Sequence, residues 1–131
     1  MLDLDLSGRR AIVTGASVGI GAVTVRLLAD HGARVAFCSR DERRVADLDG
    51  YQPATGEGSV RGYVADMADP GSVDTFLDAA EHDAGPAEIL VNNVGASPTR
   101  NFLYMSDDDW ESPFQLILMS RSGAPADACR R

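Results

Sequence analysis

Short apolar runs alternate with segments of helical periodicity along this chain, and this alternation limits its fold more than any other feature. Each run is rich in β-branched residues and stops at a polar residue or a turn, as strands buried on both faces of a parallel sheet do. The runs are residues 11–13, 34–38, 60–64 and 89–91. Because right-handed crossovers place the connecting helices on both faces, we predict a doubly wound α/β sheet with strand order 3-2-1-4.

Three helices are predicted between these strands. The first begins at Ile20 and ends at His31-Gly32, the second covers residues 41–48, and the third opens at Asp69-Pro70 and ends near residues 83–86. The apolar residues expected to face the sheet are Ile20, Val23, Leu27 and Leu28 in the first helix and Val73, Phe76, Leu77 and Ala80 in the third.

A further helical element, the fourth, is expected near Ser106, a candidate cap that precedes the acids of residues 107–109. We predict a new helix beginning at Pro113, because proline inside a helix removes a hydrogen bond. The expected buried stripe consists of Trp110, Phe114, Ile117 and Leu118. Apolar periodicity then disappears, so residues 1–119 are expected to form one domain and residues 120–131 an irregular or disordered tail.

Charge and composition exclude several classes of partner. The formal net charge of −8 opposes binding to nucleic acid or to an anionic membrane. No run reaches the roughly 18 apolar residues of a spanning helix, and the N-terminus lacks a basic leader, so we expect a cytoplasmic protein. Cys38 and Cys129 are expected to be free thiols rather than a disulfide or a metal site. All twelve basic residues are arginines.

A glycine-rich turn, Thr14 to Gly21, lies between the first strand and the first helix. In this context Gly15 permits the sharp turn, Gly19 lets the main chain approach phosphates, and Gly21 allows close packing of helix and strand. The amides at the helix N-terminus suit a pyrophosphate, and Ser17 adds a hydroxyl donor. The alternative is a glycine turn without a ligand.

A second motif, Asn92-Asn93-Val94-Gly95, follows the fourth strand. With Thr14-Gly15-x-x-x-Gly19-x-Gly21 at the expected separation, the chain resembles the front half of the short-chain dehydrogenase/reductase family from Leu6 to about Met119. Alanine is commoner in that family where Val94 stands. The resemblance implies a Rossmann-like dinucleotide-binding domain, cut short after the fourth strand and the helix that follows it.

The resemblance also implies which residues hold the cofactor. Ser39-Arg40 ends the second strand, where a basic residue would pair with the extra phosphate of NADP(H), so NADP(H) is favoured over NAD(H). Arg43 or Arg44 could help, and the alternative is that Arg40 is a solvated loop charge. The expected cofactor-binding residues are Gly15, Ser17, Val18, Gly19, Ile20, Gly21, Ser39, Arg40, Asp66, Met67, Asn93, Val94 and Gly95.

Two of these assignments have structural alternatives. Asp66 resembles the family's adenine-contacting aspartate, with Met67 beside it, but an acid before the Pro70 helix also suits a loop or cap. Residues 93–95 lie where the fourth strand should neighbour the first, and Asn and Gly also favour an ordinary strand-ending turn.

The family's catalytic Tyr-x-x-x-Lys pair is absent from this sequence. The chain contains no lysine, and Tyr51, Tyr63 and Tyr104 are followed four places later by Thr55, Met67 and Asp108, so no catalytic residue is assigned. We therefore expect cofactor binding without turnover and a truncated or frame-shifted product of a reductase gene. A carbonyl or alcohol substrate would belong only to a full-length relative.

Three functional hypotheses remain open from the sequence. The first is the NADP(H)-binding portion of an oxidoreductase, and the second is a nonenzymatic dinucleotide-binding or subunit-interaction protein that kept the cofactor site. Separately, the edge of the fourth strand is expected to be exposed and to allow association. The third, a flavodoxin-like signalling domain, fits the alternation of strands and helices but leaves the paired glycine and asparagine motifs unexplained.

Overall fold

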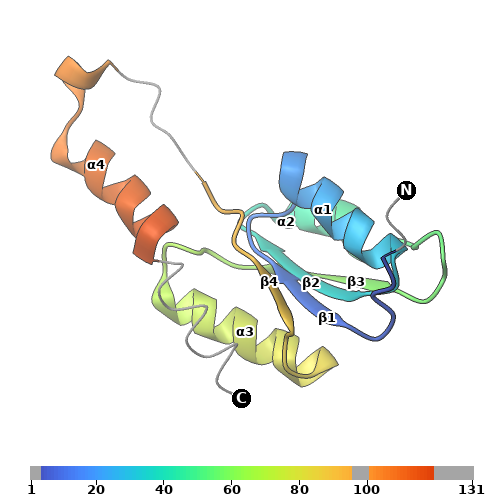
Figure 1. Ribbon diagram of the computed structural model, residues 1–131. Coiled ribbons are helices and arrows are strands. Elements are labelled where there is room, and N and C mark those ends of the chain that lie inside the picture. The colour runs from blue at the N-terminus through green and yellow to red at the C-terminus, as the bar shows by residue number, and fades with distance from the viewer. Residues whose placement is uncertain (1–3, 96–100, 120–131) are drawn as a thin grey trace.

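A single parallel sheet organises the protein, whose computed structural model describes residues 4–95 and 101–119 (Figure 1). The strands are β1 (Arg10–Val13), β2 (Arg34–Ser39), β3 (Ser59–Val64) and β4 (Ile89–Val91), in the order β3-β2-β1-β4. All three pairings are parallel. The predicted class and strand order are confirmed.

Helices cover both faces of this sheet. The first two, α1 (Gly19–Asp30) and α2 (Glu42–Leu48), lie on one face, and α3 (Pro70–Ala84) lies on the other (Figure 1). The predicted third helix is confirmed: Asp69 caps it, and Val73, Phe76 and Ala80 are buried. Within the described ranges, no helix has the length and apolarity needed to cross a membrane.

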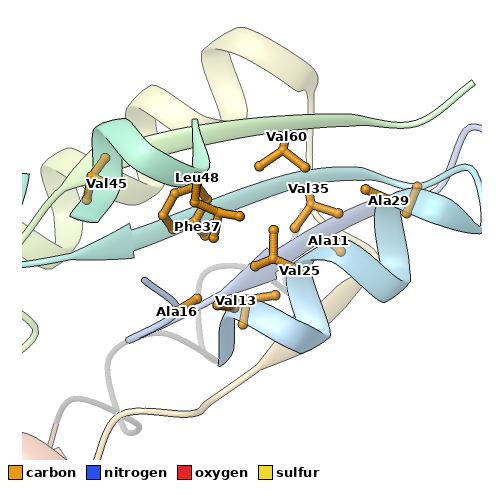
Figure 2. Packing of buried hydrophobic residues seen from close by; sticks show 12 residues of the cluster. Ala11, Val13, Ala16, Val25, Ala29, Val35, Phe37, Val45, Leu48 and Val60 are labelled. Atoms are coloured by element: carbon orange, nitrogen blue, oxygen red, sulfur yellow. The ribbon is translucent and has the colours of Figure 1, made fainter. Parts of the chain in front are cut away.

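Two apolar clusters, one on each face, join the helices to the sheet. Figure 2 shows the first, in which Val25 and Ala29 of α1 meet Val13, Val35 and Phe37 of the strands. The second cluster lies beneath α3 and is built from Ile12, Ala36, Cys38, Ala65, Met67, Val73, Phe76, Ala80 and Leu116. The carboxyl ends of the strands are thereby held at one edge of the molecule.

Most of the predicted buried stripe of α1 is wrong. Ile20, Val23 and Leu27 are 80%, 61% and 56% exposed, whereas Leu28 is partly buried and packs against the core. The residues that face the sheet are Gly21, Ala22, Val25 and Ala29. A face of small residues lets the helix axis approach the strands closely. Close packing therefore determines which face of α1 lies on the sheet more than the hydrophobicity of its side chains does.

The last described elements are the 3-10 turn η1 (Phe102–Tyr104), α4 (Asp107–Pro113) and the π-type turn η2 (Phe114–Met119). Ser106 and Asp109 form a capping box, which confirms the predicted cap. The helix predicted to begin at Pro113 is wrong, because α4 includes Pro113 and continues directly into η2. Pro113 is the last residue of α4, so its missing N–H affects only the end of that helix and does not start a new one.

The predicted stripe of this segment is also wrong. Trp110 and Phe114 are 55% and 51% exposed, and the buried residue is Leu116. The segment joins the cluster beneath α3 through that one side chain, so most of its apolar residues are left outside. The side chain of Leu118, the tail from residue 120 and Cys129 lie outside the described residues.

Tyr63 links the edge strand β3 to α3. Its hydroxyl donates to Asp83 Oδ2 at 2.5 Å, and its ring centroid lies 5.5 Å from that of Phe76. Desolvation, together with the neighbouring Asp83 carboxylate, raises the pKa of Tyr63 to about 12. The neutral phenol is therefore favoured by folding.

This shift predicts a loss of stability at alkaline pH. A folded-state pKa above the ordinary value of 10.0 gives stability that is present below pH 10 and lost as pH rises toward 12. We expect the free energy of unfolding, measured in urea across this window, to fall less steeply in Tyr63→Phe than in the wild type. Tyr104→Phe, at an exposed ring, is the control. Identical pH slopes for Tyr63→Phe and the wild type would contradict the assignment.

Candidate functional site

A groove with a volume of about 420 Å³ lies at the carboxyl ends of the strands. The glycine turn after β1, the end of β2, the loop after β3 and the segment after β4 surround it. The residues that line it are Gly15, Ser17, Val18, Ser39, Arg40, Asp41, Arg44, Ala65, Met67, Asn93, Val94, Gly95 and Leu116. This is the edge of a parallel α/β sheet at which ligands bind, beside the point where strand order reverses.

Two glycines of the turn are required for different reasons. Gly19 has φ +57°, and a Cβ atom there would meet nothing within 4 Å, so its side of the backbone is open. Gly21 faces the protein interior, where a Cβ would lie 2.5 Å from Asn93 Nδ2 and 2.6 Å from Ala16 Cα. The turn is therefore accessible on one side and tightly packed on the other.

The N-terminus of α1 differs in capping from the other α-helices in the described ranges. Asp41, Asp69 and Ser106 accept hydrogen bonds from the first amides of α2, α3 and α4, whereas Val18 at the start of α1 provides no side-chain cap. The first turn of α1 also contains no acidic residue. Uncapped amides at the positive end of a twelve-residue helix offer donors to an anion.

Asn93 fastens the segment after β4 to the glycine turn. Its side-chain Nδ2 donates to Gly15 O at 3.0 Å, and its backbone N–H donates to the Thr14 hydroxyl at 3.2 Å. Thr14 itself is 1% exposed. These bonds fix the wall formed by Asn93, Val94 and Gly95 relative to the turn.

The end of β2 forms a second polar wall. Ser17 Oγ donates to Ser39 Oγ at 2.8 Å and so connects the glycine turn to this strand. Arg40 is exposed and lines the groove, and among the described residues no ion pair involves it. A guanidinium without a carboxylate partner is thus presented at the groove.

The loop after β3 gives the groove an apolar side. Met67 is 4% exposed and lines the groove together with Ala65 and the distant Leu116. Asp66 is not a lining residue: its Oδ1 accepts the Ala68 N–H at 2.9 Å, and its own N–H donates to Ser72 Oγ. The carboxylate therefore stabilises the loop before α3.

Nine of the expected cofactor-binding residues line the groove. The other four are Gly19, Ile20 and Gly21, in the first turn of α1, and Asp66. Lining residues outside the expected set are Asp41, Arg44, Ala65 and Leu116. The sequence indicates Arg44 only as an auxiliary cation, whereas Leu116 comes from a segment whose position no local pattern indicates.

No tyrosine of the described residues lines this groove. Tyr51 donates to Asp30 and lies under the Arg26 guanidinium, and Tyr63 joins β3 to α3. Burial raises the pKa of the Cys38 thiol to about 11, so it is protonated at neutral pH. The described groove contains residues suited to binding and orientation, and none that forms a tyrosine or thiolate catalytic centre.

Comparisons with known proteins agree with this geometry. A family model described as short chain dehydrogenase matches residues 9–122. A short-chain type dehydrogenase/reductase from Picea abies is 38% identical across 91% of this chain and 49% of its own length. The chain thus spans about half the length of that relative.

Solved structures give the same result. A short chain dehydrogenase from Burkholderia cenocepacia, in complex with NADP, has a TM-score of 0.84 and 30% identity, covering 96% of this chain and 51% of its own. An L-sorbose reductase from Gluconobacter frateurii, complexed with NADPH and L-sorbose, has a TM-score of 0.85 and 27% identity, covering 93% and 46%.

A methyl group at Gly21 should destabilise the protein. Gly21→Ala places a Cβ against Asn93 and Ala16, and we expect overpacking to cost about 2 kcal/mol. Gly71→Ala, in the first turn of α3, is the matched control: its nearest contact is 3.6 Å, so the change should be neutral or stabilise by up to about 1 kcal/mol. Urea unfolding measures both variants, and equal effects would refute the close-packing role of Gly21.

Proposed function

This chain belongs to the short-chain dehydrogenase family, and from that premise we propose that it is the NADP(H)-binding portion of an oxidoreductase. The groove at the carboxyl ends of the strands is the proposed cofactor site. NADP(H), when bound in such enzymes, donates a hydride to a carbonyl or accepts one from an alcohol.

The uncapped start of α1 beside the open Gly19 is the observation that carries this proposal. A pyrophosphate is an anion that needs several directed donors, and helix-start amides supply them with a favourable dipole. Gly15, Ser17, Val18, Gly19 and Ile20 are the residues proposed to hold it, and Gly21 is proposed to serve the site by letting α1 pack closely beside them. A Cβ at Gly19 would stand on the side from which phosphate oxygens approach.

The end of β2 is the proposed site for the adenosine ribose. Arg40 is assigned to the additional phosphate of NADP(H), because a guanidinium forms bidentate, charge-assisted bonds with phosphate oxygens. The NADP and NADPH in the two solved relatives support a phosphorylated dinucleotide. Ser39 is proposed to contribute its hydroxyl beside it.

The remaining walls are assigned to the rings of the cofactor. Met67 is proposed to offer an apolar surface beside the adenosine end, and Asp66 is proposed to act there by holding the loop that carries Met67. Asn93, Val94 and Gly95 line the side next to the glycine turn. We propose that these residues orient the cofactor and restrict water.

Residues 1–119 are proposed as one cofactor-binding domain that binds without turnover, in a cytoplasmic protein. The described groove has no tyrosine, and the sequence has no lysine to lower a tyrosine pKa. Any carbonyl or alcohol substrate would belong to a longer relative. Carbonyl-dependent oxidation of NADPH by this chain would overturn this part of the proposal.

A nonenzymatic interaction role is the second candidate, and the β4 edge favours it. Within the described residues β4 pairs only with β1, so its other edge carries unpaired backbone groups, and Ile89 and Val91 are only partly buried. Open parallel edges of this kind pair with other strands. We propose association through this edge, with no affinity for nucleic acid or membranes.

Reversing the charge at Arg40 tests the cofactor assignment. In Arg40→Asp, loss of a charge-assisted contact and the new repulsion should weaken NADPH binding by at least about tenfold relative to NADH. Arg34→Asp is the matched control, because it makes the same charge change at the opposite end of β2. Calorimetric titration of both cofactors gives the ratio. An NADPH-to-NADH affinity ratio that stays constant in Arg40→Asp would show the assignment to be wrong.

A further inference from the structure

A carboxylate lies in the same wall of the groove as the two arginines. Asp41 lines the groove between Arg40 and Arg44, and its side chain is 47% exposed. Its two oxygens have separate partners. Oδ1 accepts the backbone N–H groups of Arg43 at 3.1 Å and Arg44 at 3.2 Å, and Oδ2 lies 3.3 Å from the Arg44 side-chain Nε.

The position of this pair is fixed by its neighbours. The Asp41 N–H donates to Ser39 Oγ at 3.4 Å, its carbonyl accepts the Val45 N–H at 2.9 Å, and Val45 is buried against the sheet. The side chain of Arg44 therefore projects from α2 at the position just before the buried Val45, which anchors the helix to the sheet. Its Nε is directed to Asp41, and its two terminal nitrogens remain as donors.

We propose that Asp41 is a specificity-determining residue that limits the preference for NADP(H), because its carboxylate competes with the adenosine phosphate for Arg44. This inference rests on the proposed function. Arg40, Asp41 and Arg44 together carry one net positive charge, against a phosphate of charge between −1.5 and −2. NADH lacks that phosphate, so its binding affinity should depend little on the Asp41–Arg44 ion pair.

Asp41 has two opposing effects on NADPH binding, and the solvent exposure of its ion pair with Arg44 determines which is larger. The ion pair orients Arg44, which favours phosphate binding, but exposed pairs with 56% and 47% side-chain exposure contribute little orientation. The carboxylate charge acts directly on the phosphate and also occupies Arg44. Repulsion and competition therefore outweigh orientation, and removal of the charge should strengthen NADPH binding.

Asp41→Asn separates the charge from the capping role, because asparagine caps helices as well as aspartate does. In the full chain we expect NADPH to bind about three- to tenfold more tightly, with NADH almost unchanged. Arg44→Gln should weaken NADPH binding. The double variant should bind NADPH like Arg44→Gln alone apart from residual repulsion, because the competition requires both partners.

Glu42→Gln is the matched control. Glu42 follows Asp41 in the first turn of α2 and does not line the groove, and its substitution by glutamine removes the same single negative charge. Asp41→Ser, which retains a capping hydroxyl, provides a second variant if Asp41→Asn folds poorly. Thermal unfolding of each variant reports its folding separately from its binding.

The outcomes of these titrations are distinct. A preference for NADPH over NADH that rises in Asp41→Asn and not in Glu42→Gln supports the inference. Equal shifts in both variants, or equal changes for the two cofactors, overturn it while leaving the proposed function intact. Failure of the wild-type chain to bind either cofactor removes the proposed function and this inference together.

Discussion

The turn between β1 and α1 is held from both sides by the ends of neighbouring strands, and the groove depends on that restraint. Ala16 N–H donates to Cys38 O at 3.0 Å on the β2 side, and Asn93 Nδ2 donates to Gly15 O at 3.0 Å on the β4 side. A glycine-rich backbone is otherwise costly to order. Parallel pairing on both sides of β1 supplies this order, so the helix-start amides point at a fixed place.

Local charge in the groove differs from the charge of the whole chain. The net charge is −8, yet this site contains the uncapped start of α1, Arg40 and Arg44, opposed among the described lining residues by one carboxylate, that of Asp41. Within a Debye length of roughly 8 Å at physiological salt, these near groups outweigh distant acids. An acidic protein can therefore present an anion-binding site, and one side chain can adjust its selectivity.

Patterns confined to a few neighbouring residues predicted much of this structure. The β-branched runs predicted the strands, Asp69-Pro70 predicted the start of α3, and Ser106 predicted the cap of α4. Each of these features depends on local backbone chemistry. The packed face of α1 did not follow from hydrophobicity, since Gly21 and Ala22 are selected by close approach to the sheet. The Ser17 to Ser39 bond and the place of Leu116 arise only from tertiary packing.

We propose that one groove holds a phosphorylated dinucleotide with its pyrophosphate on the α1 amides. Backbone amide chemical shifts of the isotopically labelled chain, followed during titration with NADPH and with NADH, test this most directly. We predict that both cofactors shift the amides of residues 17–21, and that NADPH shifts those of residues 40–44 by more than NADH does. Unchanged amides at residues 17–21 with saturating NADPH would show that the pyrophosphate does not bind at the start of α1.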